Sequence, residues 1–253
     1  MKYKYFLKFL VIILINIYPV YSYSINPKIK LAIATARNED DVFFSLVVDF
    51  MKAACDNLGM EIVPLYAHGD HFSLVDEIEK GAIEKKFDAV VILNFKKQLL
   101  KTANILEKNK IPFIVYNAGF DPTDNVGEPR QKFKYWIAEM LPNDEEAGYL
   151  LAKIIANATP KLKDGKKHLI AMGGNLADEA SIKRVNGLNR FINETKEKVA
   201  LDQITNGNWN KEIAKEKFPL LHKRYPNLIG YWTANDAMVL GIYGRSMDIH
   251  YIL

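Results

Sequence analysis

Amide side chains recur where apolar stretches of the chain end. Asn94 and Asn117 each end such a stretch, and Asn235, followed by Asp236, ends another. An asparagine side chain carries both a hydrogen-bond donor and an acceptor, and so does each hydroxyl group of a sugar. These positions therefore favour the binding of a neutral polyhydroxy ligand.

Aromatic side chains stand at two further positions of the same kind. Phe43 and Phe44 follow Asp41 shortly after the first apolar stretch, and Trp209 follows the stretch that ends near residue 207. Aromatic rings can cover the apolar face of a sugar ring. Together with the amides, they form the set of candidate ligand-binding residues.

Five of the candidates also have a simpler structural interpretation. Phe43 and Phe44 open an apolar helix, so we expect one of the two in the core. Trp209 could act only as a hydrophobic cap on the helix that follows it. Asn235 and Asp236 form a good helix N-cap, and that role is compatible with ligand contact.

The residue types that carry most enzymatic chemistry are not arranged for it. The single cysteine, Cys55, lies within an apolar helical pattern, and the five histidines are scattered without metal-ligand spacing. Gly173 and Gly174 lack the rest of a Gly-x-Gly-x-x-Gly motif. No pairing of a nucleophile with a base is indicated at the strand ends. We therefore expect a non-enzymatic protein without a cofactor or a metal.

The charge balance argues against nucleic acid as a partner. The net charge is +4, but Lys2, Lys4 and Lys8 in the first segment supply most of it. The nearly neutral remainder has no basic footprint for DNA or RNA. Hydrophobic residues make up 49% and charged residues 25%, which is typical of globular proteins.

The candidate residues lie in a regular alternation of strand and helix patterns. This pattern predicts an α/β fold with parallel sheets flanked by helices, in two lobes. A stretch rich in Gly, Pro and Asp, residues 118–133, separates an N-terminal lobe (29–117) from a C-terminal lobe (134–253) and is the expected hinge. Ligands of such sheets bind beyond the carboxyl ends of the strands. We therefore expect Asp41 and Asn117 to face Trp209 and Asn235 across one cleft.

The expected strands are 29–36, 60–67, 88–94 and 111–117, then 134–140, 166–174, 199–207 and 228–235. The expected helices are 41–59, 72–86 and 96–110, then 144–157, 179–193, 210–224 and one that begins at 236.

The first residues have the layout of a secretory signal. Residues 1–8 are basic, a short apolar run follows, and a polar exit lies near Ser22 and Ser24. The apolar core is short for a membrane span. We expect residues 1–24 to be a signal peptide that exports the chain to the periplasm, with an uncleaved N-terminal anchor as the alternative.

Four motifs resemble those of a known family. They are DDVFF at 40–44, LPNDEEAGYLLAKII at 141–155, SIKRVNGLNRFI at 181–192 and ANDAMVLGIYG at 234–244. In this order and spacing they resemble the type I periplasmic sugar-binding proteins of ABC transporters, a group that includes ribose-binding and autoinducer-2-binding proteins. The resemblance covers residues 30 to 244.

The resemblance implies roles for individual residues. Asp41 stands where a polar side chain contacts sugar hydroxyls, and Phe43 and Phe44 stand at stacking positions. Asn117 takes the polar position after the fourth strand. Trp209 takes the aromatic position of the second lobe, and Asn235 takes that of the hydroxyl-binding asparagine.

The sequence departs from the family pattern at three positions. Ile182 stands where an arginine often contacts the ligand. Lys97 stands where an acidic residue is common, and Val42 replaces a proline. These departures concern the identity of the ligand more than the fold.

The function that the resemblance implies is that of an exported receptor for a sugar-like solute. It would work with the membrane permease of an ABC importer, or in chemotaxis or signalling. The family continues beyond the last motif, so we expect the C-terminal part of the second lobe to be missing and binding to be weakened. The alternative is a truncated paralogue with little or no ligand binding. The sensing core of a transcription regulator is rejected, because it predicts a basic helix-turn-helix before residue 30, where this chain has a signal-like segment. An enzyme of doubly wound fold would need a nucleophile or an acid–base set at the strand ends, where amides and aromatic residues stand instead.

Overall fold

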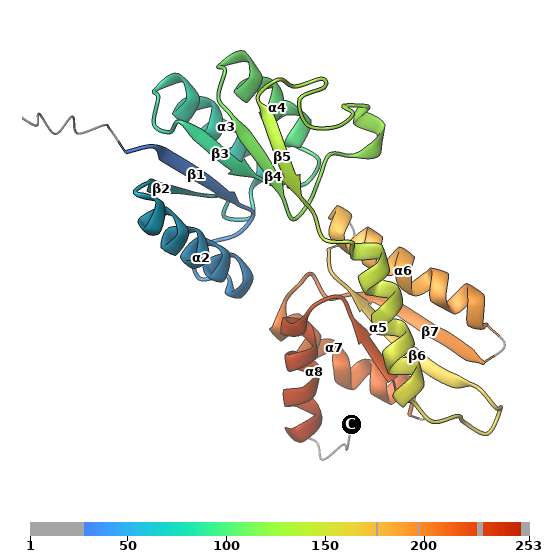
Figure 1. The fold of residues 1–253 in the computed structure, drawn as a ribbon. Coiled ribbons are helices and arrows are strands. Elements are labelled where there is room, and N and C mark those ends of the chain that lie inside the picture. Colours follow the sequence, from blue (N-terminus) through green and yellow to red (C-terminus); the bar gives the residue numbers. More distant parts are fainter. Residues whose placement is uncertain (1–27, 176, 197, 227–229, 249–253) are drawn as a thin grey trace, which may run out of the picture.

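The structure, a computed structural model, describes residues 28–248 except 176, 197 and 227–229. The expected signal peptide, residues 1–24, lies outside the described residues. Within them, the chain forms two parallel sheets flanked by helices, which confirms the predicted fold class (Figure 1).

The first sheet has five parallel strands in the order β2-β1-β3-β4-β5. Helix α2 lies on one face of this sheet, and α3 and α4 lie on the other (Figure 1). The strands are β1 (Lys30–Thr35), β2 (Glu61–Tyr66), β3 (Ala89–Ile92), β4 (Phe113–Tyr116) and β5 (Trp136–Met140). The helices are α2 (Val42–Leu58), α3 (His71–Ile83) and α4 (Leu99–Lys108), with a short 3-10 turn η1 (Pro122–Asp124).

The second sheet has three parallel strands in the order β7-β6-β8. Helices α5 and α6 pack together against it, and α7 and α8 form a second pair. The strands are β6 (Lys167–Gly173), β7 (Val199–Asn206) and β8 (Gly230–Thr233). The helices are α5 (Asp144–Ala158), α6 (Glu179–Thr195), α7 (Lys211–Arg224) and α8 (Asp236–Asp248).

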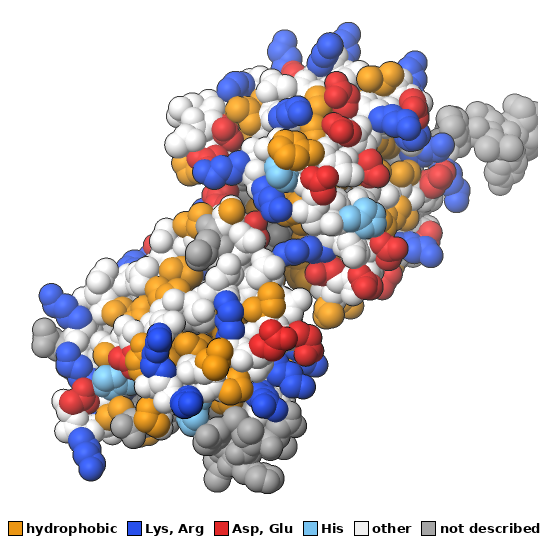
Figure 2. Space-filling model, turned by 180° about the vertical axis from the view of Figure 1, so that it is seen from behind, with side chains coloured by type: hydrophobic (Ala, Val, Ile, Leu, Met, Phe, Trp, Pro, Cys, Tyr) orange, Lys and Arg blue, Asp and Glu red, His pale blue; other side chains and the backbone are white. Residues whose placement is uncertain are grey.

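Each sheet has its own hydrophobic core. In the first lobe, Ile33, Leu106 and Phe113 are fully buried, and in the second Phe218 and Trp232 are. When helices cover both faces of a parallel sheet, its strands must carry apolar side chains on both faces. The space-filling view from behind shows acidic and basic side chains interspersed over both lobes (Figure 2).

The structure corrects the predicted boundary between the lobes. Strand β5 pairs with β4 in the first sheet and does not belong to the second. The expected hinge, 118–133, folds back onto the first lobe, where Phe133 is buried and the rings of Phe120 and Trp136 lie 4.8 Å apart. The chain therefore passes between the sheets after Met140. The Gly, Pro and Asp residues of 118–133 correctly indicated a loop. They did not indicate that Phe120 and Phe133 of this loop pack against the first core.

Candidate functional site

Two of the predicted amide residues, Asn94 and Asn117, make hydrogen bonds at the carboxyl ends of the strands in the first sheet. Asn94 donates from Nδ2 to the carbonyl of Gly119 (2.8 Å), and its Oδ1 accepts from the backbone N–H of Leu99 (3.2 Å). The backbone N–H of Asn117 donates to the carbonyl of Met140 (3.0 Å). Asn94 thus braces the end of β3, whereas Asn117 contributes its backbone N–H and has a half-buried side chain.

Asp41 and the two phenylalanines open helix α2. Oδ1 of Asp41 accepts hydrogen bonds from the backbone N–H groups of Phe43 (3.1 Å) and Phe44 (3.0 Å), as an N-cap does. Its Oδ2 takes no part in these bonds. Phe44 is buried in the core, while Phe43 is 51% exposed. Of the two predicted stacking residues, only Phe43 can offer its ring to a ligand.

Lys97, which stands where the family often has an acidic residue, has an acidic partner in the structure. Lys97 forms an ion pair with Asp121 (Nζ to Oδ2, 3.1 Å). Hydrogen bonds from Thr123, with a further one from Lys97, lower the pKa of Asp121 to about 2. The ammonium group at this strand end therefore has a carboxylate partner of its own.

In the second lobe, a network of amides holds the loop that carries Trp209. Asn208 and Trp209 both have positive φ angles, 51° and 61°, which non-glycine residues adopt at an energetic cost. Asn175 donates to Oδ1 of Asn208 (3.0 Å), and the Asn208 N–H donates to Oδ1 of Asn206 (2.7 Å). Asn235 donates from Nδ2 to the carbonyl of Trp209 (3.3 Å). These bonds stabilise a loop that would otherwise relax.

Asn235 and Asp236 also begin helix α8. Oδ1 of Asn235 accepts from the N–H of Met238 (3.0 Å), as the capping interpretation predicts. Asp236 is exposed, and its Oδ1 accepts from the N–H of Ala237 (3.0 Å). Asn235 therefore braces both the helix and the Trp209 loop, which leaves it one N–H and one lone pair for a ligand.

The Trp209 ring is held by groups that sequence reasoning missed. Its indole N–H donates to Oδ2 of Asp178 (2.8 Å), and the Arg184 guanidinium lies 5.5 Å from the ring centroid. The ring also lies against Gly174, where a Cβ would come within 2.1 Å of it. The hydrogen-bonding capacity of Asp178 was visible in the sequence, but its partner 31 residues away was not.

Arg184 shows where the carboxyl edge of the second sheet lies. Its Nε donates to the buried Asp144 (2.7 Å) and its Nη1 to the carbonyl of Ala234 (2.6 Å). Asp144 opens α5, directly after the link that leaves β5, and Ala234 directly follows β8. Both carboxyl edges therefore flank the link at residues 141–143 (Figure 1).

Among the described residues, no hydrogen bond joins the first-lobe set to the second-lobe set. The sheet edges are placed as a shared site requires. The direct facing of Asp41 and Asn117 with Trp209 and Asn235 stays a prediction.

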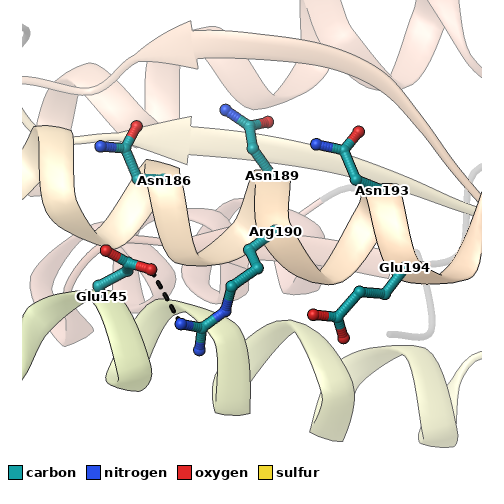
Figure 3. Close-up of a pocket in the computed structure, with 6 residues that line it drawn as sticks. All are labelled: Glu145, Asn186, Asn189, Arg190, Asn193 and Glu194. Carbon is teal, nitrogen blue, oxygen red and sulfur yellow. Dashed lines mark hydrogen bonds and ion pairs between the residues drawn. The ribbon is translucent and has the colours of Figure 1, made fainter.

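A separate hollow of about 540 Å³ lies between α5 and α6, away from the strand ends (Figure 3). The guanidinium of Arg190 bridges Glu145 (2.9 Å) and Glu146 within it. Glu194 accepts a hydrogen bond from the hydroxyl of Tyr149 (2.7 Å), and the hollow holds none of the predicted site residues. The hollow is lined by Glu145, Asn186, Asn189, Arg190, Asn193 and Glu194.

No group of three or more His, Cys, Asp or Glu side chains among the described residues is arranged to hold a metal ion. No helix there combines the length and the apolar character that crossing a membrane requires.

The sequence matches a known family over most of its length. Residues 31–244 match the family model described as the periplasmic binding protein domain. Among curated proteins, the HTH-type transcriptional repressors PurR of Vibrio atlanticus and Vibrio cholerae are 23% and 25% identical over 211 residues. The matches cover 82% and 81% of this chain, but only 57% and 55% of the repressors. The chain thus spans a little over half the length of these relatives.

Solved structures of solute-binding proteins share the fold. A periplasmic sugar-binding protein from Pseudomonas fluorescens has a TM-score of 0.77 and 25% identity, covering 88% of this chain and 65% of that one. An ABC transporter periplasmic solute binding protein from Actinobacillus succinogenes, with bound D-allose, has a TM-score of 0.72 and 21% identity, covering 88% and 74%. An ABC transporter solute binding protein from Bacillus halodurans, with bound myo-inositol, has a TM-score of 0.73 and 18% identity, covering 88% and 72%.

Proposed function

Because the chain belongs to the periplasmic binding protein domain family, we propose that it is a receptor that binds a sugar-like small solute between its two lobes. The observation that carries this proposal is the braced Trp209, which lies half-buried at the carboxyl edge of the second sheet. A strained and heavily supported aromatic residue at such an edge is typical of a binding site.

The first lobe offers groups that complement Trp209. Phe43 has half of its surface exposed, and Oδ2 of Asp41 is left over from capping α2. A ring face and a carboxylate oxygen suit the two sides of a sugar, its C–H face and its hydroxyl groups. The D-allose and myo-inositol bound to the similar structures are ligands of this class.

The cellular role that we propose is that of an exported receptor in the periplasm. It would deliver its solute to the permease of an ABC importer, or act in chemotaxis or signalling. The basic start and apolar run within residues 1–24 support export.

A second candidate is the sensing core of a transcription regulator, which the similarity to the PurR repressors favours. The two candidates differ in location. The receptor is expected outside the cytoplasm after cell fractionation, whereas a regulator is expected with the soluble cytoplasmic proteins.

Calorimetry with D-allose, myo-inositol, D-ribose and L-arabinose tests the proposed ligand class. We expect at least one of them to bind, and Phe43→Ala to weaken binding roughly 2- to 10-fold because an aromatic contact is lost. Phe50→Ala is the matched control, since Phe50 lies on the same helix and is 75% exposed, but stands about two turns further along α2 than Phe43. No binding at millimolar sugar, or equal effects of the two variants, would contradict the proposal.

A further inference from the structure

We infer that Asp178 is a positioning residue for Trp209, which fixes the indole so that it offers a ring face, and not its N–H group, to the ligand. The consequence for the ligand rests on the proposed function. The contact between Asp178 and Trp209 does not.

Asp178 occupies an N-cap position without performing its usual task. It precedes α6 with extended backbone angles, φ −90° and ψ 128°, as N-cap residues do. Yet its side chain makes no capping hydrogen bond to the helix. Its Oδ2 accepts from the indole N–H of Trp209 at 2.8 Å instead. The carboxylate is committed to the tryptophan rather than to the helix.

Contacts on other sides complete the fixation of the ring. The absence of a side chain at Gly174 lets the indole lie flat against the backbone, since a Cβ there would be 2.1 Å from Cε2 of the ring. Arg184, itself held by Asp144, lies 5.5 Å from the ring centroid. The carbonyl of Trp209 is held by Asn235. The N–H edge of the ring, its contact with Gly174 and the backbone carbonyl of Trp209 are therefore all fixed.

This arrangement limits how Trp209 can contact a ligand. A tryptophan has a single side-chain donor, and here Asp178 uses it. Trp209 can therefore contact a ligand through its ring surface, but not through a side-chain hydrogen bond. For the sugar-like solute proposed above, the geometry points to contact between the indole face and the C–H face of a cyclic sugar.

Three substitutions separate positioning from helix capping. Asp178→Asn keeps a carbonyl oxygen that can accept from the indole. Asp178→Ser is a good N-cap but is too short to reach it, and Asp178→Ala can do neither. Trp136 and Trp232 are only 2% and 0% exposed, so acrylamide quenching of tryptophan fluorescence reports mainly on Trp209.

We expect the Ala and Ser variants to show stronger quenching and red-shifted emission, and the Asn variant to resemble the wild type. For a cyclic sugar that the wild type binds, Ala and Ser should weaken affinity roughly 2- to 10-fold, and Asn should restore it. Wild-type quenching in the Ala and Ser variants would overturn the inference, because the position of the indole would then not depend on the carboxylate of Asp178. If the wild type binds no sugar, the proposed function and the proposed ring contact both fail, while the quenching data still decide the positioning role.

Discussion

Single amide side chains show how one chemical group can serve either a ligand or the fold. Asn94 and Asn235 were predicted from the sequence as ligand contacts, and each spends one donor and one acceptor site on backbone groups. The donor and acceptor that suit a sugar hydroxyl also suit a carbonyl and an N–H group. Sequence could therefore locate these residues at the strand ends, but only the structure could reveal their partners.

His168 lies between two carboxylates at the start of β6, and this should make the stability of the second lobe depend on pH. Its Nε2 lies 2.8 Å from Asp164 and its Nδ1 lies 2.9 Å from Asp202. The hydrogen bond with Asp164 has the largest effect on the pKa of His168; burial opposes it, and with the contribution of Asp202 the pKa is raised above its ordinary value of 6.5. A raised folded-state pKa stabilises the fold fully below 6.5, and that stabilisation is lost as the pH rises through the raised value.

We therefore expect His168→Gln to reduce the melting temperature more at about pH 5.5 than at about pH 9. Thermal unfolding across this range, followed by circular dichroism, measures the difference. The control is the same substitution in an Asp164→Asn, Asp202→Asn background, where the pH dependence should vanish. A stability loss that stays constant from acid to alkaline pH would show that the two ion pairs do not stabilise the lobe.

At the scale of elements, two glycines explain why α5 and α6 pack so closely. A Cβ on Gly148 would lie 2.0 Å from the carbonyl oxygen of Arg184, and one on Gly187 would lie 1.8 Å from that of Glu145. The two helices touch backbone to backbone at these points. The glycines of the motifs at 141–155 and 181–192 therefore serve helix packing. The backbone carbonyl of Arg184, in the second motif, lies against Gly148 in the same contact.

Gly187→Ala should destabilise the protein, although the same change usually stabilises a helix by about 0.5–1 kcal/mol. Backbone atoms cannot move aside as a flexible side chain can, so we expect a loss of roughly 1–3 kcal/mol from overpacking. Urea unfolding gives the free energy. Gly244→Ala in α8 is the matched control because no atom lies within 4 Å of its added Cβ, and it should gain up to about 1 kcal/mol. Equal signs for the two variants would refute this account of the contact.

The elements themselves could be predicted well, because apolar periodicity and caps are local signals. The helix expected at 144–157 is observed as Asp144–Ala158, and the one expected at 179–193 as Glu179–Thr195. The sheet to which strand β5 belongs could not be predicted. Its partner is chosen by side chains such as Trp136, which is buried in the first core, and burial of this kind depends on tertiary packing.

At the scale of the whole molecule, the described chain crosses once between two separate cores. The cores share no cluster of buried residues, and the crossing at 141–143 is short. In such an arrangement each lobe can fold around its own core, and closure of the lobes on a ligand is a hinge motion. The position of the hinge then decides which fragment of the chain is a complete folding unit.

We expect the fragment 29–140 to fold alone and the fragment 29–117 not to. The shorter fragment ends at the predicted lobe boundary and lacks β5, Phe133 and Trp136, whose side chains are at most 3% exposed in the first core. Loss of one large buried aromatic side chain costs about 3–5 kcal/mol, and small domains have only about 5–15 kcal/mol of stability in total. The shorter fragment would also leave the edge of β4 unpaired along its length.

Urea unfolding of both fragments, followed by circular dichroism, should therefore show a cooperative transition only for 29–140. If 29–117 unfolds cooperatively at the same urea concentration, the segment 118–140 contributes nothing to the first core, and the lobe boundary belongs at residue 117 after all.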